Sequence, residues 1–551
     1  MRKILGIAIL SCCAAILPAD QESPQFIRPI TGDQAILHAL DRLTFGPRPG
    51  DVEMVKEMGL RQWIDLQLHP ERIPQDPELA EQIQSLGQAS APGAFAQRPE
   101  NSLSPRQANA LRRATAEEDR FMLSRLPEDQ EVQVLAAMPL IRQRVAATLS
   151  PELQEKVRAA ARGTVVDAIK KGAKQAGQKL AQAKFYRAVE SSRQLEEVLT
   201  DFWFNHFNVD AGKGADRILT AAYERDVIRP HVLGKFRDLL EATANSPAMM
   251  FYLDNWQSTA VDVPVNRSRP GKASHGLNEN YGRELMELHT LGVDGGYTQK
   301  DVTEVARCFT GWSIQAPRLN GPFVFRDAMH DQGEKMVLGV RIPAGGGKSD
   351  GERVLDILAR HPATAQHISR ELAQRFVADD PPQPLVDRMA KTFRDTDGDL
   401  RAVLEAMFSS PEFFSQGAYR AKIKSPFEMM VSALRATGAT IANSASLAAR
   451  IATLGEPLYR KVEPTGYSNA GSDWINSAAL VERMNFAMDL AANRVDGVNV
   501  DSSKFPAEPA RAARQLLFTS ASQQTLDAIG SQSDPAVVAG MLLGSPDFQR
   551  R

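Results

Sequence analysis

Apolar residues recur at intervals of three and four along most of this 551-residue chain, which is the spacing of one helix face. In GDQAILHALDRLTFG, for example, Ile36, Leu40 and Leu43 form one stripe. Strand-like alternation is convincing only near residues 321–343, where two short apolar runs indicate a hairpin. The pattern therefore predicts a mainly α fold, a large multi-helical assembly with a short β-hairpin near residues 321–343.

The first nineteen residues break this pattern. Arg2 and Lys3 precede an apolar run over residues 4–17, an arrangement typical of a secretory signal peptide cleaved after Ala19. A transmembrane helix needs ~20 apolar residues, and neither this run nor any later segment is long enough. We expect export to the periplasm, the cell envelope or the extracellular space, with no transmembrane anchor in the mature chain. Cys12 leaves lipoprotein processing as an alternative.

Composition divides the chain beyond the signal peptide at residues 1–19. Residues 20–85 predict an N-terminal helical segment, and residues 86–107, rich in Pro, Gly and Ser, predict a linker or exposed loop. Residues 108–190 are rich in Ala, Gln, Glu, Arg and Lys, which predicts a helical insertion packed as a hairpin against the main body. Residues 191–551 are predicted to form the main helical domain.

Charge and cysteine content exclude some functions. The net charge is −2, and it becomes −4 once Arg2 and Lys3 leave with the signal peptide. This is not the basic balance of a nucleic-acid-binding protein. The mature chain keeps only Cys308, which lies in an apolar-periodic helix and is predicted to be a small buried hydrophobe.

Serine residues mark several predicted helix starts. Ser-Pro pairs at 246–247, 410–411 and 545–546 each offer a capping oxygen followed by proline at the first helical position. Ser425 and Glu428 have the spacing of a capping box. We interpret these positions as structural joints.

The segment NENYGRELMELHTLGVDGGYT, residues 278–298, concentrates charge on one helix. Glu279, Arg283 and Glu287 are four residues apart and predict an exposed ion-pair ladder. His289 is predicted to interact with the helix dipole at the C-terminal end, before a left-handed Gly292. The spacing matches neither a di-iron helix nor a zinc protease helix.

Glu284 and His206 form the best catalytic hypothesis. Glu284 lies at the border of the apolar face of its helix, with Asn280 one turn earlier as a predicted binding residue. His206 lies within the apolar face of LEEVLTDFWFNHFNV, where a histidine is commonly a core residue. If the two meet across helices, a buried histidine beside a carboxylate can act as a general base.

Three further residues lie close to His206 in the sequence. Asn205, Asn208 and Trp203 offer hydrogen-bonding groups and are predicted to be binding residues.

The loop RDAMHDQGEK, residues 326–335, provides a candidate metal site. His330 and Asp331 follow a strand, and we expect His330 to be reachable from solvent. They are the predicted ligands of a divalent metal if one is used, although a hydrated His-Asp pair is the common outcome. The later AGGGKSD lacks the phosphate-loop spacing, so Ser349 and Asp350 are predicted to cap the next helix.

Several blocks together resemble the bacterial family known as domain of unknown function 1800. They are HALDRLTFGPRPGDV, FWFNHFNV, ENYGRELMELHTLGVDGGYTQKDVTEVARCFTGW, HPATAQHISRELAQRFV and KSPFEMMVSALRATGA. The resemblance implies an exported protein whose gene often lies beside that of another exported family resembling alkaline phosphatases and sulfatases. It implies no established activity. Cys308 departs from the family pattern, where a small residue is more usual.

Two functional hypotheses follow. The first is a helical scaffold or partner protein that acts with a co-exported, alkaline phosphatase/sulfatase-like enzyme at the cell envelope. The second is a metal- or acid/base-dependent hydrolase with a site around Glu284 and His206.

Overall fold

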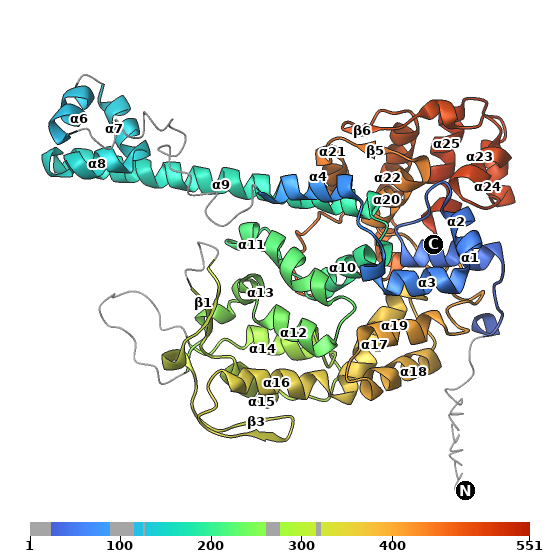
Figure 1. Cartoon of the computed structure of the whole chain (residues 1–551), viewed down its shortest axis with the longest axis horizontal. Helices are drawn as coiled ribbons and strands as arrows, with labels where there is room; N and C mark the ends of the chain where they lie inside the picture. Colours follow the sequence, from blue (N-terminus) through green and yellow to red (C-terminus); the bar gives the residue numbers. More distant parts are fainter. Residues whose placement is uncertain (1–23, 89–114, 125–126, 261–275, 316–320) are drawn as a thin grey trace, which may run out of the picture.

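The computed structural model describes residues 24–88, 115–124, 127–260, 276–315 and 321–551, and it is mainly α (Figure 1). The predicted signal peptide and most of the predicted linker lie outside the described residues. Within those residues, no helix combines the length and the apolar character that crossing a bilayer requires.

The N-terminal helices pack along the side of the body and are followed by a projecting arm (Figure 1). They are α1 (Asp33–Leu43), α2 (Asp51–Met58), α3 (Leu60–Leu68) and α4 (Pro77–Gln88). The arm contains α6 (Ala116–Leu123), α7 (Glu128–Ala137), α8 (Pro139–Val145) and α9 (Pro151–Glu190).

Two further groups of helices complete the body. The first comprises α10 (Gln194–His206), α11 (Asp216–Ala222), α12 (Phe236–Ala244), α13 (Pro247–Tyr252), α14 (Asn280–Glu287), α15 (Gln299–Cys308), α16 (Ser349–Ala359), α17 (Pro362–Phe376), α18 (Gln383–Asp395) and α19 (Leu400–Phe408). The second comprises α20 (Pro426–Thr437), α21 (Ala445–Thr453), α22 (Ser477–Ala491), α23 (Pro509–Leu516), α24 (Gln523–Ile529), α25 (Pro535–Gly544) and α26 (Pro546–Gln549). One continuous apolar core, from Phe26 to Phe548, joins them.

The strands form small antiparallel pairs. The pairs are β1 (Trp312–Ile314) with β2 (Phe323–Phe325), β3 (Lys335–Val337) with β4 (Val340–Ile342), and β5 (Thr440–Ile441) with β6 (Val498–Asn499). The predicted strand material near residues 321–343 is confirmed. Its pairing differs, because β2 pairs with the preceding β1 and β3 turns back onto β4, so that the two runs belong to separate sheets.

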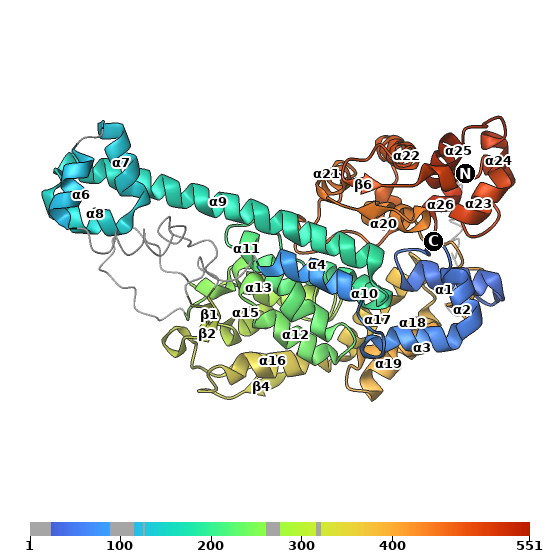
Figure 2. The same cartoon turned by 45° about the horizontal axis from the view of Figure 1, so that its top comes forward.

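The arm differs most from the sequence-based expectation. Helix α9 has 40 residues, which at 1.5 Å per residue makes it roughly 60 Å long. Its C-terminal part packs on the body beside α4 and α11, whereas its N-terminal part carries α6, α7 and α8 far from the body (Figures 1 and 2). The expectation of a hairpin packed against the body is therefore wrong.

The three short helices and the start of α9 form a unit that we call the head. Its core is separate from that of the body and consists of Leu123, Leu135, Ile141, Val145, Leu149 and Val157. The unpacked part of α9 needs no contact with the body, because a helix satisfies its own backbone hydrogen bonds.

Most of the predicted joints form as expected. Ser246 and Ser545 cap α13 and α26, and Ser425 and Glu428 form the capping box of α20. Ser410 instead accepts a hydrogen bond within a turn. Proline at the first helical position therefore marks a helix start only where the following segment continues as a helix.

Helix α14 confirms part of the predicted ladder. Arg283 lies 3.6 Å from Glu279, but Glu287 accepts a hydrogen bond from Tyr297 instead. Gly292 is left-handed, with φ of 82°. The His289 ring is buried, and burial holds its pKa well below the usual value, so it is not the cation predicted to interact with the dipole.

We expect Leu135→Ala to loosen the head without loosening the body. Leu135 is fully buried, and such truncations typically cost about 2–5 kcal/mol. Because the head has its own core, amide hydrogen exchange should accelerate in α6 to α8 and stay unchanged in α20. Leu434→Ala, at an equally buried position in α20, is the matched control and should accelerate exchange in the body. Equal effects of both variants everywhere would show that the two cores unfold as one.

Candidate functional site

Helix α10 ends at His206, whose ring is buried between two acceptors. Nδ1 lies 3.1 Å from Oε2 of Glu371 on α17, and Nε2 lies 3.2 Å from the backbone oxygen of His289. A carboxylate and a carbonyl both accept hydrogen bonds, so both ring nitrogens can donate only in the imidazolium form. Although burial acts to raise the pKa of Glu371, its hydrogen bond with His206 and the nearby histidines lower it overall. This contact links α10 to α17, and it is an ion pair when the ring is protonated.

Glu284 does not meet His206 in the way the sequence suggested. The carboxylate that contacts His206 belongs to Glu371, and the side chain of Glu284 forms no hydrogen bond or ion pair with any described residue. Glu284 is partly buried, and its pKa is raised by burial and by Glu287. Asn280 is exposed at the first position of α14. Catalytic roles for Glu284 and His206, and a binding role for Asn280, stay predictions.

A polar cavity of about 60 Å³ lies on another side of α10, and we call it the α10 cavity. It is lined by α10 and the residues after it, by α9, α17 and α20, and by the segment 456–474. Its charged lining residues are Lys184, Asp201, Arg375, Lys422, Glu428, Glu456 and Arg551, and its aromatic lining residues are Phe202, Phe204, Tyr459, Tyr467 and Trp474. Such a density of charge within a helical core marks it as the candidate functional site.

Two of the three predicted binding residues near His206 line this cavity. Asn205 donates to the backbone oxygen of Tyr467 and accepts from its N–H, at 2.7 and 2.6 Å. Asn208 donates to the backbone oxygens of Lys461 and Glu463. Both amides thus hold the segment 456–474 against α10. Trp203 is fully buried in the aromatic core and does not line the cavity.

Glu428 is held as a carboxylate at the start of α20. It accepts from the backbone N–H of Ser425 and pairs with the guanidinium groups of Arg375 and Arg551, the latter at 2.7 Å. Although burial alone would raise it, these cations bring the pKa of Glu428 to about 2. The capping box that sequence reasoning treated as a structural joint is also part of the cavity wall.

Glu456 has the opposite character. It accepts from the backbone N–H of Phe427 at 2.7 Å and from the hydroxyl of Ser425 at 3.3 Å. Burial, together with the carboxylate of Asp201, raises the pKa of Glu456 to about 8. Asp201 in turn lies 2.6 Å from Nζ of Lys184. The cavity therefore contains one carboxylic acid, Glu456, that keeps its proton at neutral pH. It also contains two carboxylates, Asp201 and Glu428, that pair with cations.

Sequence reasoning did not find this set. Its members come from positions 184 to 551, and only the fold brings them together. One local signal exists, because Asp201 interrupts the apolar run of α10 between Thr200 and Phe202. A charge that ends up facing the core side of a helix needs a partner.

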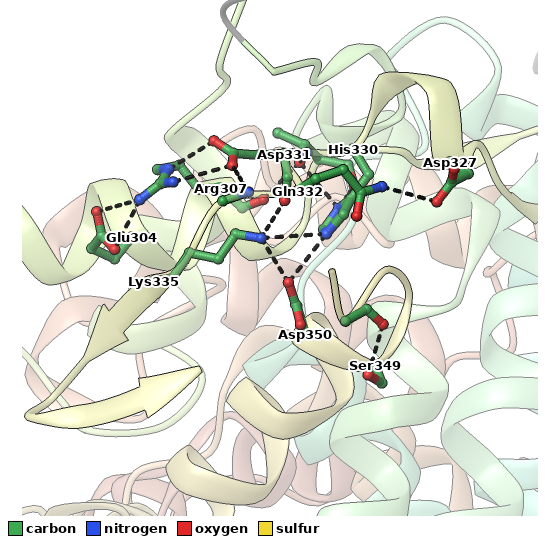
Figure 3. Close-up of polar contacts among 12 residues, drawn as sticks. Glu304, Arg307, Asp327, His330, Asp331, Gln332, Lys335, Ser349 and Asp350 are labelled. Carbon is green, nitrogen blue, oxygen red and sulfur yellow. Dashed lines mark hydrogen bonds and ion pairs between the residues drawn. The ribbon is translucent and has the colours of Figure 1, made fainter. Parts of the chain in front are cut away.

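The predicted metal ligands His330 and Asp331 have different partners (Figure 3). Asp331 forms a two-pronged ion pair with Arg307, at 2.8 and 3.1 Å. The side chain of His330 is fully buried, so the expectation that it faces solvent is wrong. No three His, Cys, Asp or Glu side chains among the described residues are placed to hold a metal ion.

Asp350 and Cys308 lie near His330. Asp350 does not cap α16 as predicted, since its carboxylate contacts His330 and Lys335 instead. Cys308 is buried as predicted, and burial raises the pKa of its thiol to about 12. A thiol in this state is a poor nucleophile.

The family match covers nearly the whole chain. Residues 38–550 match the family described as protein of unknown function (DUF1800), and the chain belongs to it. No curated protein and no solved structure matches the chain.

We expect Glu456→Gln and Glu428→Gln to change the pH dependence of stability in opposite directions. The folded protein keeps the Glu456 proton up to about pH 8, whereas an unfolded glutamic acid loses it near pH ~4.3. Folding takes up a proton between these values, so the Glu456 contribution falls as the pH rises through this window. The free energy of unfolding of Glu456→Gln should therefore improve relative to wild type from about pH 5 to about pH 8.

Glu428→Gln should instead lose about 3–5 kcal/mol at neutral pH, because it leaves Arg375 and Arg551 without their carboxylate. Since its folded pKa of about 2 lies below the unfolded value, that loss should shrink as the pH falls toward 2. Urea unfolding at several pH values measures both effects. Parallel pH profiles for the two variants would contradict the assignment of their protonation states.

Proposed function

For this member of the DUF1800 family, we propose a role as an exported helical scaffold that binds a co-exported enzyme at the cell envelope. The observation that carries the proposal is the arm, in which α9 holds a head with its own apolar core far from the body (Figures 1 and 2). The arm adds no packing to the body along its outer part. An element of this kind is more readily explained by contact with another molecule than by stability of its own chain.

The proposed partner is a protein that resembles alkaline phosphatases and sulfatases, because genes of this family often lie beside genes for such proteins. Export by the predicted signal peptide would bring both proteins to the same compartment. The head offers acidic side chains for such a contact, since Glu117, Glu155 and Asp129 are exposed. The side chains of Glu117 and Glu155 form no hydrogen bond or ion pair with any described residue, whereas the neighbouring Glu118 and Glu152 are paired.

We expect the double variant Glu117→Lys and Glu155→Lys to reduce partner capture from an extract of the native host. Two reversals that together cost ~1.4 kcal/mol would lower the affinity about tenfold. The matched control is Glu53→Lys with Glu57→Lys, at exposed positions of α2 on the body, and it should capture as much partner as wild type. Equal capture by both double variants would exclude the head as the contact. Failure of the wild-type protein to retain any exported protein would contradict the scaffold role itself.

A second candidate function is acid/base hydrolysis in the α10 cavity. It is favoured by the contrast between Glu456, which is protonated at neutral pH, and Asp201, which pairs with Lys184. Groups with separated protonation states in one cavity are the usual basis for assigning a general acid and a base. In this alternative, the hydrolase hypothesis keeps its location beside α10 and takes Glu456 as proton donor and Asp201 as base in place of Glu284 and His206.

We expect any hydrolytic activity on chromogenic phosphate, sulfate, ester or glycoside substrates to fall as the pH rises above about 8, because Glu456 then loses its proton. Glu456→Gln should lower kcat by roughly 10²- to 10⁴-fold, the usual contribution of a general acid. Glu463→Gln makes the same substitution at an exposed position of the segment 456–474 and should not change kcat. Activity that survives both Glu456→Gln and Asp201→Asn would rule out catalysis in this cavity.

A further inference from the structure

A second buried polar cluster lies between β3 and the start of α16 (Figure 3), and none of its residues lines the α10 cavity. Nζ of Lys335 is 2.6 Å from Oδ2 of Asp350, and neither side chain is exposed to solvent. Lys335 also donates to the backbone oxygen of Asp331. An amine and a carboxyl group are thus held together out of contact with bulk solvent.

His330 contacts both members of this pair. Its Nε2 lies 3.2 Å from Oδ2 of Asp350 and 3.4 Å from Nζ of Lys335. Its Nδ1 lies 2.8 Å from the backbone oxygen of Thr310, which can only accept, so Nδ1 carries hydrogen. In the neutral ring, Nε2 is then a free base that faces the amine and the carboxyl group.

The other oxygen of Asp350 is unusual. Oδ1 is buried and has no hydrogen-bond partner. It lies so close to Gly346 that a β-carbon built there would stand 1.9 Å from it. An unpartnered carboxylate oxygen is costly to bury, whereas a neutral carbonyl oxygen in the same place costs less.

We propose that Lys335 and Asp350 condense to an isopeptide bond that covalently joins β3 to α16. Nε2 of His330 takes a proton from Nζ of Lys335 and passes one to Asp350, which leaves a neutral amine beside a carboxylic acid. The lone pair of Nζ attacks Cγ of Asp350, a C–N bond forms, and a C–O bond breaks. The hydroxyl group leaves as water with one of the two protons of the neutral amine, and the other proton stays on the amide nitrogen, so the step needs no oxidant and no co-reactant. His330 ends the sequence in the protonation state in which it began.

The location suits such a link. Residues 335 and 350 lie on opposite sides of the glycine-rich turn 345–347, which the AGGGKSD motif provides. The bond would close this turn and fix the orientation of the β3–β4 hairpin on the body. It would also explain why Asp350, at the end of this Gly-rich loop, is buried and does not cap α16.

Peptide mapping of the purified wild-type protein tests this. Trypsin does not cleave after an acylated lysine, so residues 327–341 should remain uncut at Lys335 and stay joined to residues 349–353. The joined species should weigh one water molecule less than the sum of the two peptides. The internal control is Lys348 with Glu352, whose Nζ and Oε1 are also 2.6 Å apart but partly exposed to solvent, and which should stay unlinked. Recovery of residues 327–335 and 349–353 as separate peptides in full yield overturns the proposal.

Two variants assign the reacting groups. Asp350→Asn should still give a joined species if the chemistry is as stated, because loss of ammonia replaces loss of water and the joined mass is unchanged. Lys335→Arg should abolish the joined species, and a crosslink that persists in it would refute the assignment to Lys335. The wild-type peptide map alone decides whether the bond exists, so the proposal is tested even if a variant fails to fold.

Discussion

The body of this protein depends on the carboxylate of Glu428. It lies at the start of α20, accepts the capping hydrogen bond from Ser425, and pairs with Arg375 of α17 and with Arg551. These contacts tie the first group of body helices to the second group and to Arg551, the last residue of the sequence. A buried pair of this kind adds little over an apolar contact, but loss of one partner leaves an uncompensated charge in the core. The position of the α10 cavity follows from this pair, since the same side chains form its wall.

The sequence predicted the mainly α class, the strands near residues 321–343 and the serine-capped starts of α13, α20 and α26, because these depend on local periodicity and capping chemistry. Gly292 and the box of Ser425 and Glu428 are examples, since each needs only neighbours within four residues. The partners of polar side chains could not be predicted in this way. His206 was correctly placed on the apolar face of α10, but its carboxylate comes from α17, 165 residues away, and not from Glu284. His330 looked like a loop residue and proved to be buried, because Thr310, Lys335 and Asp350 pack against its ring.

The same distinction explains the site. Asn205 and Asn208 were recognised as polar groups at the end of an apolar helix, and they line the cavity. Their amides bind the backbone of the segment 456–474, so they position this segment in the wall of the cavity. Glu456 and Lys184 gave no local signal, because a raised carboxyl pKa and a buried lysine arise only from neighbours that the fold supplies.

The length of α9 has a hydrodynamic consequence. A rod of roughly 60 Å that ends in a small head gives the molecule a larger frictional coefficient than a sphere of equal mass. On a size-exclusion column a single copy would therefore elute early, in the range of a compact oligomer. Elution volume alone would overstate the number of subunits, and only a mass measurement independent of shape, such as light scattering, would give the stoichiometry of this chain or of its complexes.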